Sequence, residues 1–237
     1  MIFLPLALVA KADAQTKTYT MNIIQVPFPE TQFFKQAFRK EQIVLHFTAG
    51  ADNPKGVFDW WESTPEKVAT PYVIGRDGTI YQGYDASYWA AHIGITVNNN
   101  VHLDLMNYKT RANSLSLETK SVGIEICNWG PLSQVNGKFV NAYHGEVPAD
   151  QVVEFKDGFR KYRFYHKFTD AQVQATRELL RALCDRFAIP SKYNADMWDL
   201  SGAAMAGKPG IWTHVSYHAG KFDCHPQENL VSMLKSI

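Results

Sequence analysis

Short apolar runs separated by polar turns predict a chain in which strands and helices alternate. Residues 42–47 (QIVLHF) form a short, mostly apolar run with β-branched side chains, as expected for a strand buried on both faces. Residues 121–127 (SVGIEIC) have the same character, and residues 211–214 (IWTH) predict a final strand near the C-terminus. These three segments are predicted to be strands of a sheet.

A hairpin is predicted between the first two of these strands. Residues 71–75 (PYVIG) and 79–82 (TIYQ) flank Arg76, Asp77 and Gly78. An Asp-Gly pair between two apolar runs is a strong signal for a tight turn between antiparallel strands.

Three helices are predicted outside the strands. Residues 54–62 begin with a proline in the first turn, and residues 226–234 predict a closing helix. The clearest helix starts at Thr169, which forms a capping-box pattern with Gln172, and it ends before Pro190. Its apolar stripe, which we interpret as core, consists of Val173, Thr176, Leu180, Leu183, Cys184 and Phe187.

The order of these elements predicts an α/β fold: one domain with a central mixed sheet flanked by helices. Two polar, aromatic segments, roughly 96–120 and 131–167, are predicted to be loop insertions. We expect residues 1–35 to form an N-terminal extension and residues 36–237 to form the domain. Residues 1–15 contain a short apolar run and an Ala-Asp-Ala sequence but no basic start, so a cleaved signal, a buried strand and a plain extension all stay open.

Composition narrows the class of function. The 237 residues are 46% hydrophobic, and the net charge of +1 disfavours nucleic acid as a partner. The three cysteines, Cys127, Cys184 and Cys224, allow at most one disulfide, and no apolar run reaches the roughly 18 residues of a membrane span. We expect a monomer.

Histidine and carboxylate side chains predict a metal site. His46 stands in the apolar strand 42–47, where an imidazole must be hydrogen-bonded or ligated. His214 ends the last strand, and Asp223 follows after a short loop. Two histidines and one carboxylate are typical of a catalytic zinc ion with an open fourth position.

Four blocks of sequence resemble the N-acetylmuramoyl-L-alanine amidase type 2 family, zinc amidases related to the peptidoglycan recognition proteins. They are LHFTAG at 45–50, YVIGRDGTIYQ at 72–82, SVGIEICN at 121–128 and THVSYHAGKFDCHP at 213–226. The resemblance implies that His46, His214 and Asp223 bind Zn²⁺. It also implies hydrolysis of the amide bond between N-acetylmuramic acid and L-alanine, in peptidoglycan or a muropeptide.

The third ligand has rivals in its own loop. Asp223 is preferred because it stands two residues after Lys221, as in the family. Many relatives have a cysteine as third ligand, and Cys224 is adjacent. His218 and His225 are the other nearby donors.

The resemblance also assigns the catalytic groups. Glu125 lies in a buried strand, and it is implied to orient or deprotonate the attacking water; the alternative is a structural ion pair. Some relatives use a tyrosine before the second strand instead. Thr70 stands at that position here, so the chain resembles the glutamate-using branch. Lys221 is expected to stabilise the oxyanion.

Substrate contacts are expected from His92, Asn128 and Trp129. His92 lies in a block (WAAHIG) that lines the cleft in the family. The alternative function is a peptidoglycan-binding protein without activity, although such relatives typically lack a zinc ligand. The absence of a His-Glu-x-x-His helix disfavours other zinc peptidases. We expect action on the bacterial cell wall, whether periplasmic, secreted or phage-delivered as an endolysin.

Overall fold

A six-stranded mixed sheet forms the centre of the molecule. The computed structural model describes residues 21–94 and 111–237. The strand order is β1-β4-β3-β5-β2-β11; β3 and β4 are antiparallel, and every other neighbouring pair is parallel. The strands are β1 (Ile23–Gln25), β2 (Gln42–Phe47), β3 (Tyr72–Ile74), β4 (Ile80–Gln82), β5 (Ser121–Ile126) and β11 (Gly210–Thr213).

The predicted strands 42–47 and 121–127 lie side by side as β2 and β5. All six residues of β2 are buried, because β5 and β11 pair with its two edges and side chains cover both faces. The parallel register places His46 opposite Glu125 near the carboxyl ends of both strands. Two polar side chains are therefore held next to each other inside an apolar layer.

One strand of the central sheet was not predicted. Residues 23–25, part of the segment expected to be an N-terminal extension, form β1 and pair in parallel with β4. The strand has three residues, and two of them are exposed. Such a short run carries too weak an alternation to be recognised in the sequence.

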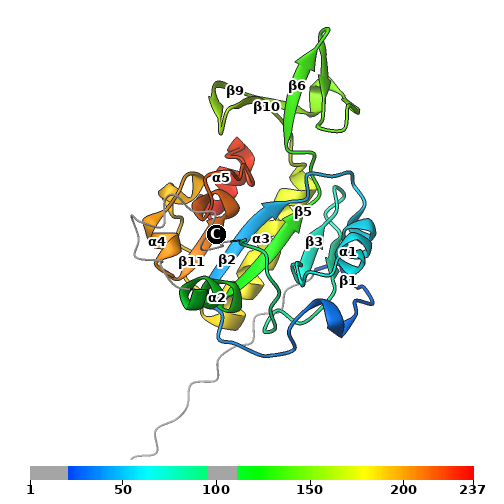
Figure 1. Cartoon of the computed structure of the whole chain (residues 1–237). Helices are drawn as coiled ribbons and strands as arrows, with labels where there is room; N and C mark the ends of the chain where they lie inside the picture. The colour runs from blue at the N-terminus through cyan, green and yellow to red at the C-terminus, as the bar shows by residue number, and fades with distance from the viewer. Residues whose placement is uncertain (1–20, 95–110) are drawn as a thin grey trace, which may run out of the picture.

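Helices cover the sheet (Figure 1), and the predicted ones are present. The long helix has the predicted capping box: Gln172 N donates to Thr169 Oγ1 (3.0 Å), and Thr169 N donates to Gln172 Oε1 (3.1 Å). Such a cap is worth about 1 kcal/mol. The helices are α1 (Pro54–Ser63), α2 (Arg111–Lys120), α3 (Asp170–Phe187), α4 (Gly202–Met205) and α5 (Glu228–Lys235), with short 3-10 helices at Glu30–Gln32, Ala149–Gln151, Ala195–Trp198 and His214–Ser216.

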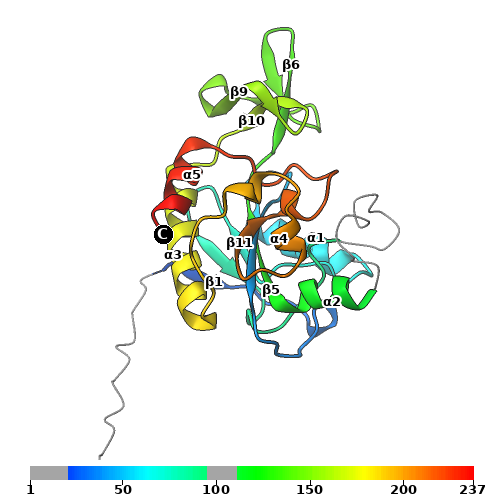
Figure 2. The ribbon, with the colours of Figure 1, turned by 90° about the vertical axis from the view of Figure 1, so that its left-hand side faces the viewer.

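The predicted insertion at 131–167 forms a second, antiparallel sheet. Its order is β8-β7-β6-β10-β9, and it projects from the end of the central sheet towards which β2 and β5 point (Figures 1 and 2). Its strands are β6 (Pro131–Val135), β7 (Lys138–Val140), β8 (Glu146–Val147), β9 (Val152–Phe159) and β10 (Tyr162–His166). Most of their residues are exposed or half-buried, so the apolar alternation that marks a strand is missing from the sequence.

The inserted sheet is anchored to the C-terminal part of the chain. Arg160 donates from a guanidinium nitrogen to the carbonyl of Val215 (3.0 Å) and forms an ion pair with Asp199 (2.9 Å). The ring of Tyr165 packs against the buried ring of His225, with 4.7 Å between centroids. These contacts fix the inserted sheet above the carboxyl ends of β2 and β5.

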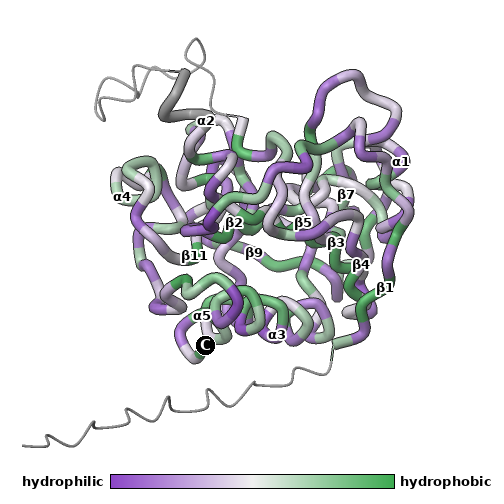
Figure 3. Tube along the Cα trace, turned by 90° about the horizontal axis from the view of Figure 1, so that it is seen from below, coloured by the Kyte–Doolittle hydropathy of each residue, from purple (hydrophilic) through white to green (hydrophobic). Residues whose placement is uncertain are grey.

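The core lies between the central sheet and its helices. Figure 3 shows the hydrophobic stretches gathered along β2, β3 and β5. The apolar stripe predicted for α3 is buried except for Phe187, which is partly buried. Cys127, Cys184 and Cys224 are buried and unpaired. Within residues 21–94 and 111–237, no helix is long and apolar enough to cross a membrane.

Candidate metal centre

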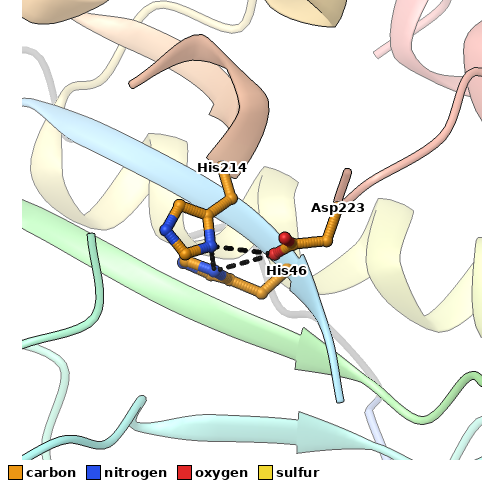
Figure 4. Close-up of side chains that lie close together, drawn as sticks. All are labelled: His46, His214 and Asp223. Carbon is orange, nitrogen blue, oxygen red and sulfur yellow. Dashed lines mark hydrogen bonds and ion pairs between the residues drawn. The ribbon is translucent and has the colours of Figure 1, made fainter. Parts of the chain in front are cut away.

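His46, His214 and Asp223 converge at the carboxyl ends of β2 and β11 (Figure 4). His214 Nδ1 lies 2.9 Å from His46 Nδ1 and 2.9 Å from Asp223 Oδ2, and His46 Nδ1 lies 3.3 Å from the same oxygen. Ligand bonds of about 2.0–2.1 Å around a tetrahedral ion put the ligand atoms roughly 3.3 Å apart. The spacing therefore fits a shared metal ion.

The protonation states also fit a cation. Burial and the neighbouring His214 lower the pKa of His46 to about 4, so its ring is neutral at pH 7. Burial alone would raise the pKa of Asp223, but His214 and His46 outweigh it and hold that pKa well below its usual range. An ionised carboxylate and a neutral imidazole are the forms that bind metals.

A hydrogen-bond chain fixes the tautomer of His46. Ser121 Oγ donates to the carbonyl of Leu117 (2.7 Å), which can only accept. Ser121 Oγ then accepts from His92 Nε2 (2.8 Å), which leaves His92 Nδ1 to accept from His46 Nε2 (3.0 Å). His46 Nδ1 consequently carries a lone pair and faces the centre.

The tautomer of His214 follows from one carbonyl. His214 Nε2 donates to the oxygen of Ile93 (2.8 Å), so its Nδ1 is also left as an acceptor facing the centre. Unless a metal ion or a proton lies between them, two imidazole lone pairs and a carboxylate oxygen would repel one another at this distance. The donor set thus fits a metal ion by chemistry as well as by spacing.

Glu118 holds the segment that supplies both of these contacts. Its buried carboxylate accepts from three consecutive backbone amides, those of His92 (2.8 Å), Ile93 (3.1 Å) and Gly94 (3.0 Å). Sequence analysis did not single out Glu118 or Ser121, because their partners are brought to them only by the fold.

A missing side chain makes room for His92. A Cβ atom at Gly123 would come within 2.5 Å of Thr70 Cγ2 and 3.1 Å of His92 Cγ. A larger residue at this point of β5 would force Thr70 to move and would press against His92.

Glu125 carries a buried carboxyl oxygen, Oε2, that lacks a hydrogen-bond partner among the described residues. Burial and the nearby Asp223 raise the pKa of Glu125 to about 8, and Lys221 opposes the shift. A buried carboxylate without a fixed partner is costly, so its position next to a candidate metal centre indicates a chemical role.

A cleft of about 280 Å³ opens over this centre. Glu125, Lys221 and His92 line it together with the three converging residues. Thr70 lines it too, and its hydroxyl donates to the carbonyl of Tyr72 (2.9 Å). The cleft gives a substrate access to both the centre and Glu125.

Asn128 and Trp129 lie at the base of the inserted sheet. Asn128 is buried; its Nδ2 donates to the carbonyl of His166 (2.9 Å), and its Oδ1 accepts from Gly130 N (2.7 Å). The ring of Trp129 packs 5.9 Å from that of Tyr143. A substrate contact of Asn128 or Trp129 stays a prediction.

The rival donors lie outside the converging group. Cys224 is part of the apolar core, and the ring of His225 stacks on Phe168 at 4.4 Å. His218 Nδ1 accepts from the backbone amide of Gly220 (2.9 Å). The loop thus turns Asp223 towards His46 and His214 and its neighbours elsewhere.

The fold and the site together define an α/β domain with a buried His-His-Asp group at the carboxyl ends of parallel strands. The chain belongs to the N-acetylmuramoyl-L-alanine amidase family, whose model matches residues 37–226. No match was found among curated protein sequences.

One solved structure supports the assignment of the fold, and two others show weaker similarity. A mutant endolysin from Bacillus subtilis matches with a TM-score of 0.50 at 16% identity, over 92% of this chain and 98% of that one. The N-acetylmuramoyl-L-alanine amidase LysC from Clostridium intestinale URNW matches with a TM-score of 0.45 at 14% identity, over 92% and 97%. An AmpD derivative matches with a TM-score of 0.43 at 16% identity, over 91% and 96%.

Proposed function

We propose that this protein is a zinc-dependent hydrolase of the amide bond between N-acetylmuramic acid and L-alanine. The observation that carries the proposal is the convergence of His46, His214 and Asp223 beneath a cleft that also presents the unpartnered carboxylate oxygen of Glu125. The family to which the chain belongs supports the same reaction. The substrate is peptidoglycan or a soluble muropeptide, and the place of action is the bacterial cell wall.

The proposed chemistry divides the work among the residues of the cleft. Zinc, when bound, supplies Lewis-acid activation of the carbonyl and of water. Glu125 accepts the proton of the attacking water and passes it to the leaving amine. Lys221, which lines the same cleft, stabilises the oxyanion of the tetrahedral intermediate. The products are a lactyl carboxylate on the sugar and a free stem peptide.

Digestion of purified peptidoglycan, followed by mass spectrometry of the products, tests the proposal. The expected products are free stem peptides that begin with L-alanine, released from an intact glycan strand. A chelator should abolish their release, and added zinc should restore it.

Glu125→Gln separates catalysis from binding. This variant should keep its zinc and lose activity by a factor on the order of 100 or more, since the general base is removed. Zinc-loaded wild-type protein that binds peptidoglycan but releases no peptide would instead establish the binding-only alternative.

A further inference from the structure

The cleft over the candidate metal centre continues into a second hollow of about 400 Å³. Trp60, Trp61 and Glu125 line both, so the two form one groove. Tyr143 enters the second hollow from the turn between β7 and β8. The inserted sheet therefore supplies part of the wall of this groove.

Two exposed aromatic rings line the second hollow. Trp60 of α1 is 60% exposed and Tyr143 is 72% exposed, whereas the adjacent Trp61 is buried in the core. Large aromatic side chains left in solvent within a groove mark a surface that binds something, because apolar area of this size is otherwise buried.

The turn that carries Tyr143 is held by hydrogen bonds to Asn141. The buried Asn141 accepts at Oδ1 from the backbone amides of Tyr143 (2.9 Å) and Gly145 (2.9 Å), and Asn141 N donates to Gly145 O (2.9 Å). The ring of Trp129 packs against that of Tyr143, with 5.9 Å between centroids. A backbone turn held in this way costs little further conformational entropy to order when a ligand stacks on Tyr143.

The charge of the hollow selects between the two halves of the substrate. Among the described residues that line it, Glu125 is the only charged one; the rest are aromatic, small, aliphatic or neutral and polar. A stem peptide carries carboxylates, which would need cationic partners. An N-acetylhexosamine ring is neutral and has an apolar face that stacks on aromatic rings, and its hydroxyl and acetamido groups suit polar neighbours such as Asn53.

We propose that Trp60 and Tyr143 form a subsite for a neutral N-acetylhexosamine ring of the glycan strand, adjacent to the metal centre. This inference rests on the proposed function for the identity of the substrate. It gives the inserted sheet a role: it extends the groove so that the protein holds the sugar chain as well as the bond to be cut.

Binding of chitotetraose, a neutral oligomer of N-acetylglucosamine, to the zinc-loaded protein tests the subsite by calorimetry. Trp60→Ala and Tyr143→Ala should each weaken binding about 10-fold or more, as expected for the loss of an aromatic contact at the centre of a binding site. Tyr143→Phe should bind like wild type, because it keeps the ring. Val135→Ala, which changes an exposed residue of the same sheet outside the groove, is the matched control and should have no effect.

Chitotetraose contains no lactyl–peptide bond, so this test is independent of hydrolysis. If chitotetraose binds as expected but peptidoglycan is not cleaved, the proposed function fails and the subsite stands. The subsite is overturned if wild-type protein does not bind chitotetraose at millimolar concentration, or if both alanine variants bind it as tightly as wild type. It is also overturned if Tyr143→Ala weakens binding of a free stem peptide and leaves that of chitotetraose unchanged.

Discussion

His92 Nδ1 lies 3.0 Å from His46 Nε2, and this contact determines which nitrogen of His46 faces the candidate metal centre. This contact is one of a series of hydrogen bonds, and its direction is set at the other end of that series, where Ser121 Oγ donates to the carbonyl of Leu117. His92 was expected to contact substrate. It lines the cleft, and it also orients His46 from behind.

The first prediction concerns this contact. His92→Ala should lower zinc affinity by roughly 10- to 100-fold, as is typical when the partner of a metal-binding histidine is removed. Ser121→Ala, which cuts the chain one bond further away, should have a smaller effect in the same direction. Competition with a chromophoric chelator measures both affinities, and unchanged affinity in His92→Ala would refute the orienting role.

The second prediction concerns the third ligand. Asp223→Ala should lose zinc, since Asp223 supplies the only carboxylate of the converging group. His218→Ala is the matched control, because His218 lies in the same loop and outside that group; it should keep zinc, and so should Cys224→Ser. Metal content after dialysis decides the matter. If Cys224→Ser loses the metal and Asp223→Ala keeps it, the assignment is wrong by one residue.

The third prediction concerns Glu118. Glu118→Ala leaves the amides of His92, Ile93 and Gly94 without their acceptor, and a buried amide left unpaired, such as that of Ile93, costs about 1–3 kcal/mol. We expect a lower free energy of unfolding, measured in urea, together with weaker zinc binding. Glu118→Gln keeps one acceptor oxygen, so its free energy of unfolding and its zinc affinity should lie between those of wild type and Glu118→Ala. Loss of stability with wild-type zinc affinity would show that the segment 92–94 does not orient the ligands.

The fourth prediction concerns pH and the metal-free protein. The pKa of Glu125 is raised from 4.5 to about 8, so between these values the folded state binds more protons than the unfolded state. The contribution of Glu125 to the free energy of unfolding therefore falls as pH rises through this window. Relative to Glu125→Gln, the free energy of unfolding of wild type should fall by up to about 4 kcal/mol between pH 5 and pH 8. Urea unfolding in the presence of a chelator measures the difference, and parallel pH profiles would contradict the raised pKa.

The sequence by itself determined the central strands, the hairpin and the capped helix α3. β2 and α3 are recognisable because a strand buried on both faces must be a continuous apolar run, and a helix packed on one side must repeat its apolar residues every three or four positions. His46 and Glu125 stood out for the same reason, as polar residues inside such runs. His214 and Asp223 were candidates from their places at the end of the last predicted strand and shortly after it, the family blocks favoured Asp223 over its neighbours, and the structure brings both together with His46.

Only the tertiary structure decided how these residues are supported and what surrounds them. Glu118 contacts the segment 92–94, and His92 contacts Ser121. These residues are more than 20 positions apart in the sequence, so no local sequence pattern predicts the contacts. The inserted sheet could not be predicted because its strands are largely exposed, and apolar alternation arises only where one face is buried. Tyr143 reaches the groove because the inserted sheet is anchored next to it. The sequence around Tyr143 does not show that Tyr143 lies near Trp60.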